Sequence, residues 1–228
     1  MENNAGKTLL EERENEEQIK DSPDYTIDKI HHQALIILFG LGNQGKTSTL
    51  TDLLFLLTNV DVANYVNNNF ISKKKQNHYQ DNYYVLHYND STIFIATYGD
   101  GSSECERNQD FFEHKPIDKP IYIIEGINVK LLKDLPKKEQ KSKYYKQVPD
   151  FCIAACRTEG GSVDATLYIA KKFLPHIKQE VWIRKIGMQP GESPDYINPS
   201  IPIITKKDDI LAKEILALIN RLRKGNSI

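Results

Sequence analysis

Cysteine, net charge and long apolar runs are all scarce in this sequence. Its three cysteines cannot pair completely and have no metal-ligand spacing, so we expect no disulfide framework and a reducing, cytoplasmic location. Thirty basic and 31 acidic residues leave a net charge of −1, so the overall charge does not predict nucleic acid as a partner. No run approaches the ~20 apolar residues that span a membrane, and we expect no membrane association.

The charges that are present are unevenly distributed. Residues 1–30 contain nine acidic and four basic residues and no apolar stretch, the reverse of a secretion signal, so we interpret them as an acidic, disordered tail. Residues 31–228 are expected to form one domain. Within it, residues 128–148 carry seven lysines and two acids, net +5. We interpret this segment as a basic insertion, mainly solvated, that could dock a protein partner. Tyr144 and Tyr145 among the lysines leave a nucleic-acid patch as the alternative.

Apolar runs predict the sheet. Ala34–Phe39 is apolar without alternation, which is typical of a strand buried on both faces of a parallel sheet. Tyr83–Tyr88 and Thr92–Thr97, joined by Asn89, Asp90 and Ser91, predict a hairpin. Further strands are expected over Ile121–Ile124, Phe151–Cys156 and Val181–Ile183.

Helical patterns alternate with these strands. Thr47–Leu57 carries Leu50, Leu53, Leu54 and Leu57 at helical spacing. Other helices are predicted from Ser102 or Ser103, with Glu106 completing a capping box behind Ser103, and over Val163–Phe173 and Asp208–Arg223. Residues 59–81 are expected to be irregular. The alternation predicts a three-layer α/β fold whose sheet is mostly parallel with one antiparallel hairpin strand.

The most informative segment directly follows the first strand. It matches the pattern G-x-x-x-x-G-K-[ST] and consists of Gly40, Leu41, Gly42, Asn43, Gln44, Gly45, Lys46 and Thr47. Glycines let backbone N–H groups approach phosphate closely, and the N-terminus of the following helix favours anions. This segment resembles the Walker A motif of the P-loop NTPase superfamily. We call residues 40–48 the glycine loop.

The resemblance implies a role for each residue of the glycine loop. The backbone from Gly40 to Ser48 would surround the phosphates of ATP or GTP, and Lys46 would reach the β- and γ-phosphates. The Thr47 hydroxyl would bind Mg²⁺. Fold class follows from the resemblance more directly than the reaction does, because this fold supports many chemistries.

An acidic residue should complete the Mg²⁺ site, and two candidates follow apolar runs. Asp100 comes after Thr92–Thr97, in a loop resembling the switch of GTPase-like members, although Ser103 replaces the glycine of their D-x-x-G pattern. Glu125 ends Ile121–Ile124 and resembles the acidic strand end of uridine-kinase-like P-loop kinases. We favour Asp100, because its longer strand can reach the sheet centre beside the glycine loop, whereas Ile121–Ile124 is typical of an edge or a cover. An ordinary turn aspartate is the alternative for Asp100, since Gly-Asp-Gly is also a turn sequence.

Two further segments bear on ligand contacts. Arg157 follows Phe151–Cys156, at the strand end where α/β sheets bind ligands, so it could touch phosphate or base; a solvated loop arginine is the alternative. Thr205-Lys206-Lys207-Asp208 matches the guanine-reading [NT]-K-x-D motif of GTPases. Thr205 and Asp208 also fit the N-cap of the last helix, which is the interpretation we favour.

Three functions are compatible with these residues. The first is Mg²⁺-dependent hydrolysis of ATP or GTP as a switch, with Lys46 and Asp100 acting on the γ-phosphate. The second is a small-molecule or nucleotide kinase, supported by Glu125 and Arg157 but weakened by the scarcity of arginine between residues 100 and 200. The third is a module that binds nucleotide without turnover. The sequence does not choose between adenine and guanine.

Overall fold

The computed structural model describes residues 34–41, 44–70, 81–158, 160–172, 179–185, 203–204 and 208–224. All of them belong to one compact unit, His31–Ile228, which is separate from Met1–Ile30. The predicted tail therefore lies outside the described residues. Within the described ranges, no helix has both the length and the apolar character needed to span a bilayer.

An eight-stranded sheet forms the centre of the unit, in the order β5-β4-β2-β3-β6-β1-β7-β8. Of the seven pairings between these strands, five are parallel, whereas β2–β3 and β4–β5 are antiparallel. The strands are β1 (Ala34–Phe39), β2 (Tyr83–Tyr88), β3 (Ser91–Ala96), β4 (Ile121–Glu125), β5 (Asn128–Leu131), β6 (Phe151–Cys156), β7 (Gln179–Lys185) and β8 (Ile203–Ile204). The prediction of a mostly parallel α/β sheet containing a hairpin is confirmed.

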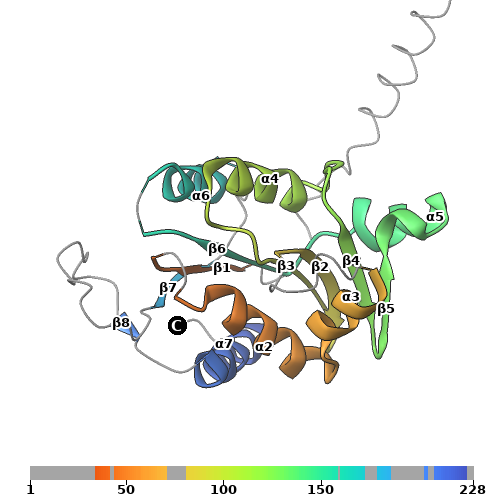
Figure 1. Cartoon of the computed structure of the whole chain (residues 1–228), viewed down its shortest axis with the longest axis horizontal. Helices are drawn as coiled ribbons and strands as arrows, with labels where there is room; N and C mark the ends of the chain where they lie inside the picture. The colour runs from red at the N-terminus through yellow and green to blue at the C-terminus, as the bar shows by residue number, and fades with distance from the viewer. Residues whose placement is uncertain are drawn as a thin grey trace, which may run out of the picture. The chain divides into compact units, whose positions relative to one another are not determined.

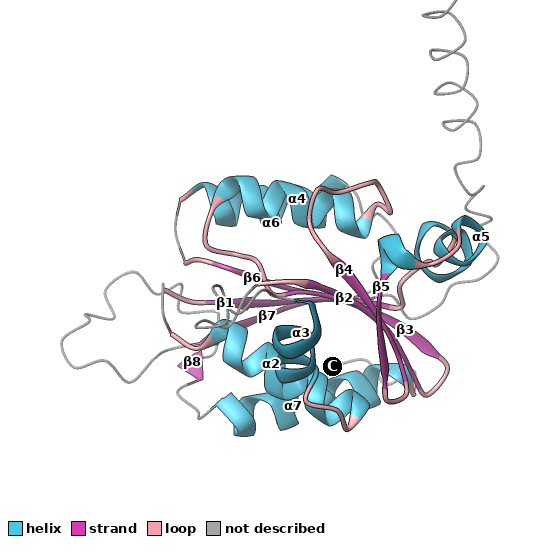
Figure 2. Ribbon diagram, turned by 45° about the vertical axis from the view of Figure 1, so that its right-hand side comes forward, coloured by secondary structure: helices cyan, strands magenta, loops and turns pink. Residues whose placement is uncertain are grey.

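Helices cover both faces of this sheet, which gives three layers (Figures 1 and 2). One face carries α2 (Lys46–Thr58), α3 (Val62–Phe70) and α7 (Asp208–Arg223), and the other carries α4 (Ser102–Phe112) and α6 (Gly161–Lys172). The arrangement follows from the alternation of side chains along a strand, because successive residues point to opposite faces. Ile36 and Leu38 belong to the core cluster under α2 and α7, whereas Leu35 and Ile37 belong to the cluster under α4.

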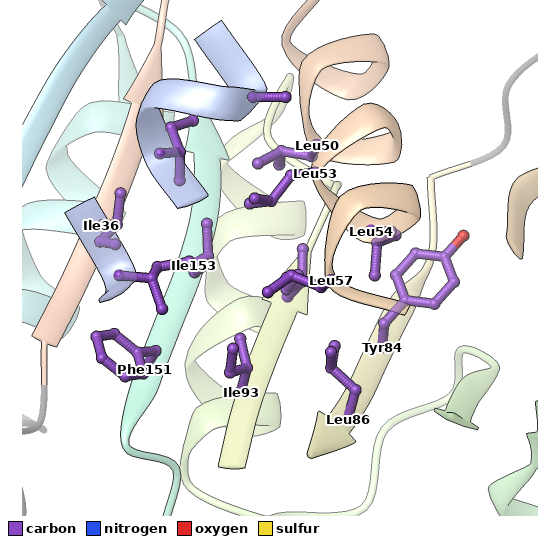
Figure 3. Close-up of a cluster of buried hydrophobic side chains, with 14 of the residues drawn as sticks. Ile36, Leu50, Leu53, Leu54, Leu57, Tyr84, Leu86, Ile93, Phe151 and Ile153 are labelled. Atoms are coloured by element: carbon purple, nitrogen blue, oxygen red, sulfur yellow. The ribbon is translucent and has the colours of Figure 1, made fainter. Parts of the chain in front are cut away.

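The core under α2 explains why residues 47–57 form a helix. Leucines at helical spacing on α2 point toward side chains of the central strands (Figure 3). Leu50, Leu53 and Leu54 are fully buried there, together with Ile93 and Ile153. Burying a leucine contributes about 1.5–3 kcal/mol, so this stripe fixes the helix against the sheet and thereby fixes the glycine loop at its start.

Strand direction decides which chain ends meet at the glycine loop. Since β1, β3, β6 and β7 are parallel, their carboxyl ends lie at one edge of the sheet, and the antiparallel β2 begins at that same edge. From the sequence we had expected the second hairpin strand, β3, to lie next to β1. Instead, β6 separates the two strands.

The structure corrects two further predictions about elements. Residues 59–81 contain α3, whose Val62 and Val66 are both buried at i, i+4 spacing, and residues 71–80 lie outside the described ranges. The run Ile121–Ile124 is not at an edge, because β4 pairs with β2 on one side and β5 on the other.

The basic insertion is a folded part of the domain. It comprises β5, a 3₁₀ turn η2 (Leu132–Asp134), the short helix α5 (Lys137–Gln140) and a π-helical turn η3 (Lys141–Tyr145). Tyr144 is fully buried, stacks on Phe111 with ring centroids 5.8 Å apart, and donates its hydroxyl to the Phe111 carbonyl at 2.9 Å. This tyrosine is therefore a core residue and offers no face on which a base could stack.

Candidate functional site

The glycine loop connects β1 to α2 at the carboxyl edge of the parallel strands. The Gly40 N–H donates to the carbonyl of Cys156 at 3.2 Å, which aligns the loop's start with the end of β6. The Leu41 N–H donates to Gln44 Oε1 at 3.0 Å. Gly45 has φ +80°, in the left-handed region that glycine tolerates best, and α2 begins at the next residue. Gly42 and Asn43 lie outside the described residues.

Lys46 turns its ammonium group back toward the loop. Its side chain is 5% exposed, and Nζ donates to the carbonyls of Gly40 at 3.1 Å and Leu41 at 2.8 Å. Nζ also lies 3.5 Å from Asp100 Oδ1. Burial lowers the pKa of Lys46, and the neighbouring Asp100 carboxylate opposes that shift. The structure thus brings together the lysine and the aspartate that the sequence singled out.

Asp100 reaches Lys46 although a strand separates β3 from β1. The chain leaving β3 passes over the end of β6 at Gly99, where a Cβ atom would lie 2.3 Å from the Ala155 carbonyl oxygen. A glycine is therefore required for this close approach. Glu104 stabilises the loop beyond it by accepting hydrogen bonds from the N–H groups of Asp100 at 2.8 Å and Gly101 at 3.1 Å. Glu104, not the predicted Glu106, forms the cap of α4.

Arg157 contacts the same carboxylate from the end of β6. Its Nε lies 3.5 Å from Asp100 Oδ1, and its backbone N–H donates to Ser162 Oγ at 3.1 Å. Arg157 and Asp100 are each about half exposed. Asp100 therefore bridges two cationic side chains, one buried and one accessible, directly beside the glycine loop.

Thr47 has a partner that the sequence analysis missed. Its hydroxyl donates to Asp81 Oδ1 at 3.0 Å. Burial raises the pKa of Asp81 to about 6; the Thr47 hydrogen bond opposes the shift, and the Glu104 and Asp100 carboxylates reinforce it. Asp81 lies two residues before β2, in the segment expected to be irregular. The predicted hairpin could have indicated Asp81. Because β2 is antiparallel to β3, the residues just before β2 lie beside the carboxyl end of β3.

Asp208 packs against the glycine loop from another side. Its Oδ1 lies 2.6 Å from Lys185 Nζ and accepts from Thr49 Oγ1 at 3.3 Å. A Cβ atom on Gly45 would lie only 2.7 Å from this oxygen. Asp208 is the first residue of α7, whereas the other three residues of the guanine-reading match, 205–207, lie outside the described ranges. These contacts account for Asp208 without a base.

Glu125 lies at the end of the strands opposite to the glycine loop. The strand β4 is parallel to β2 and so runs against β3, which directs its carboxyl end away from the glycine loop. Glu125 pairs with Lys143 at 2.5 Å and Lys130 at 3.5 Å, and the Lys143 hydrogen bond lowers its pKa. The structure therefore groups Lys46, Thr47, Asp100 and Arg157 with the unforeseen Asp81, and separates Glu125 from them. Ser48 is half-buried in the first turn of α2.

The side-chain oxygen atoms beside the glycine loop are suitable ligands for a cation that also binds a substrate phosphate. Within the described residues, no group of three or more His, Cys, Asp or Glu side chains could hold a metal by itself. Mg²⁺ is commonly bound through one or two carboxylates together with water and substrate phosphates. The Thr47 hydroxyl and the Asp81 and Asp100 carboxylates are hard oxygen donors of this kind, so the residues present fit the ion.

Comparison with known proteins identifies no relative: no protein-family model, curated protein or solved structure matches this chain.

Proposed function

We propose that this protein binds ATP or GTP at the glycine loop and hydrolyses it in a Mg²⁺-dependent manner, acting as a cytoplasmic switch. One observation carries the proposal. The buried Lys46, at the N-terminus of α2, lies 3.5 Å from Asp100, which also holds the half-exposed Arg157. A loop-held lysine, a second cation and a carboxylate thus converge at the carboxyl edge of a mostly parallel sheet, where α/β proteins bind their ligands.

The side chains of this cluster can serve a triphosphate in distinct ways. The first N–H groups of α2 have no acceptor within the helix and, with its dipole, favour an anion. Lys46 can exchange its two carbonyl acceptors for phosphate oxygens, and the accessible Arg157 can join it. Thr47 and a nearby carboxylate, which the sequence predicts to be Asp100, would hold Mg²⁺; when bound, the ion offsets charge on the phosphates.

Hydrolysis has more support than phosphoryl transfer to a second substrate. The kinase interpretation relied on Glu125 and Arg157, and Glu125 is paired with Lys143 and Lys130 at the end of the strands opposite to the glycine loop.

We retain the basic insertion as the docking surface for a protein partner. Its exposed lysines are Lys130, Lys133, Lys137, Lys138, Lys141 and Lys146.

Thermal unfolding in the presence of nucleotides tests the proposal. ATP, GTP, CTP and UTP are compared with and without Mg²⁺; a ligand at 100 times its Kd stabilises the fold by about 2.7 kcal/mol. We expect one purine triphosphate to raise the melting temperature most. The variant Lys46→Ala should abolish this gain, whereas Lys137→Ala, which removes an exposed lysine of α5, should retain it.

Chromatography of released diphosphate then identifies the reaction. Slow diphosphate release above the Lys46→Ala background supports hydrolysis. Consumption of ATP only in step with an added acceptor would establish a kinase instead, and binding without turnover would establish a non-hydrolysing module. If no triphosphate stabilises the wild-type chain, or if Lys46→Ala is stabilised equally, the nucleotide site itself is wrong.

A further inference from the structure

We infer that Asp81 is the carboxylate that holds the metal ion together with Thr47, and that Asp100 instead positions the cations Lys46 and Arg157. The inference rests on the proposed function and changes the assignment of its acidic residues. It is carried by three observations: the separation of the oxygen atoms of Thr47 and Asp81, the partners of each carboxylate, and the anchoring of Asp81 to the sheet.

The oxygen atoms of Thr47 and Asp81 are spaced as neighbouring ligands would be. Mg²⁺ takes octahedral oxygen ligands at about 2.0–2.1 Å, so two adjacent ligand atoms lie roughly 2.9 Å apart. The separation between Thr47 Oγ1 and Asp81 Oδ1 is 3.0 Å. Little movement of either side chain is needed for both to bind one ion, and the Thr47 hydroxyl is the group that the glycine-loop motif offers to a metal.

The partners of the two carboxylates differ in charge. Asp100 Oδ1 lies 3.5 Å from both Lys46 Nζ and Arg157 Nε, so its negative charge is already compensated by two cations that would repel a third. Asp81 accepts its hydrogen bond from a neutral hydroxyl. Among the described residues, the Glu104 and Asp100 carboxylates raise its pKa and the Lys46 ammonium lowers it. The net surroundings of Asp81 therefore favour a divalent cation.

The backbone beside Asp81 is fixed to the sheet. Asn82 accepts a hydrogen bond from the Thr97 N–H at 3.1 Å, and its own N–H donates to Thr97 Oγ1 at 2.8 Å. Asp81 therefore lies just before β2, in backbone that is hydrogen-bonded to the end of β3. A ligand held on such a rigid element keeps its geometry better than one on a free loop.

The test separates the metal role from a merely structural hydrogen bond. The affinity of the full chain for its purine triphosphate is measured by fluorescence titration in excess Mg²⁺ and in EDTA, and the ratio of the two is the Mg²⁺ gain. Asp81→Asn keeps an acceptor for Thr47 but removes the charge. Asp100→Asn is the competing variant, and Asp61→Asn, near the start of α3, is the control.

We expect Asp81→Asn to spare affinity in EDTA but to reduce the Mg²⁺ gain by at least roughly tenfold, the lower end of the loss when a residue that only supports a metal ligand is removed. Asp100→Asn should keep the gain and bind more tightly in EDTA, because Lys46 and Arg157 are released toward phosphate. A full Mg²⁺ gain in Asp81→Asn overturns the assignment. Loss of the gain in Asp100→Asn overturns the role given to Asp100 and restores it as a metal ligand.

Two further results are kept distinct from these. If the wild-type chain binds no triphosphate, the proposed function fails, not only the assignment of the acids. Circular dichroism checks each variant for folding. Should Asp81→Asn not fold, Asp81→Ala replaces it, since alanine removes both the charge and the oxygen ligands; a retained Mg²⁺ gain in that variant overturns the inference equally.

Discussion

Two lysine–aspartate pairs contact the same glycine loop; both lysines are buried, but the pairs differ in length and in the exposure of the aspartate. Lys185 and Asp208 lie 2.6 Å apart, with side chains 4% and 34% exposed, and Asp208 also accepts from Thr49. Lys46 and Asp100 lie 3.5 Å apart, with side chains 5% and 48% exposed. The first pair is short and ties β7 to α7 and α2. The second is long, and its carboxylate is open to solvent and shared with Arg157.

The difference indicates how the loop is built. The Lys185–Asp208 pair supports it from residues far along the chain, so that a loop with little side-chain packing of its own keeps its shape. The Lys46–Asp100 pair is arranged so that its charges can change partners. We therefore expect substitutions in the first pair to affect the stability of the fold and substitutions in the second to affect ligand binding.

The largest effect is expected from breaking the shorter pair. Asp208→Ala removes the carboxylate that lies 2.6 Å from the buried Lys185 ammonium and accepts from the Thr49 hydroxyl. We expect the free energy of unfolding to fall by about 3 kcal/mol, the lower end for removal of one partner from a buried pair. Chemical denaturation measures the loss. Asp209→Ala is the matched control: its exposed pair with Lys213 spans 3.7 Å and should contribute less than about 0.5 kcal/mol. Equal losses in the two variants would remove the distinction between the pairs.

An intermediate effect is expected at the glycine that packs against Asp208. Gly45→Ala adds a Cβ atom at φ +80° and 2.7 Å from Asp208 Oδ1. We expect a loss of about 2 kcal/mol, combining backbone strain with displacement of the carboxylate. Gly160→Ala isolates the strain, because Gly160 has the same φ and no atom within 4 Å of its Cβ position. If denaturation curves show the same loss of unfolding free energy for both variants, the contact between residue 45 and Asp208 adds nothing to the cost of Gly45→Ala.

The smallest effect on stability is expected at Lys46. Burial lowers the pKa of Lys46, which means that the charged form is costly in the folded state. Lys46→Met keeps the length of the side chain and removes the charge, so the free energy of unfolding should change by less than about 1 kcal/mol. The same variant should lose triphosphate affinity at least about tenfold, by roughly 1.4 kcal/mol. A stability loss comparable to that of Asp208→Ala would make Lys46 a structural residue like Lys185.

Local sequence signals predicted the elements well where neighbouring residues decide them. The hairpin is joined at Asn89 and Asp90, both with positive φ, as a tight two-residue turn requires. The last helix spans Asp208–Arg223 as predicted, because its apolar residues repeat at helical spacing. The glycine loop likewise follows β1 and precedes α2. These features depend on periodicity and on the conformational range of single residues, both of which can be read from the chain.

Long-range features were predicted less well. Arg157 does follow the carboxyl end of its strand, as expected, and its Nε lies 3.5 Å from Asp100 Oδ1. Its contact with phosphate or base stays a prediction. The edge position expected for Ile121–Ile124 was wrong, and the end of the sheet at which Glu125 lies could not be predicted, since the direction of its strand depends on which strand it pairs with. Tyr144 looked available for stacking because lysines surround it in sequence, yet its ring fills the core beside Phe111.

Local patterns in the chain were enough to predict the apolar strands, the hairpin, the last helix and the position of the glycine loop between a strand and a helix. The folded molecule was needed to see that β6 separates β1 from β3, that Asp81 meets Thr47 across 34 residues, and that Asp208 meets Thr49 across 159. Periodicity specifies which face of an element is buried, whereas strand order depends on how all the buried faces pack together, and that order determines which distant polar side chains share one edge.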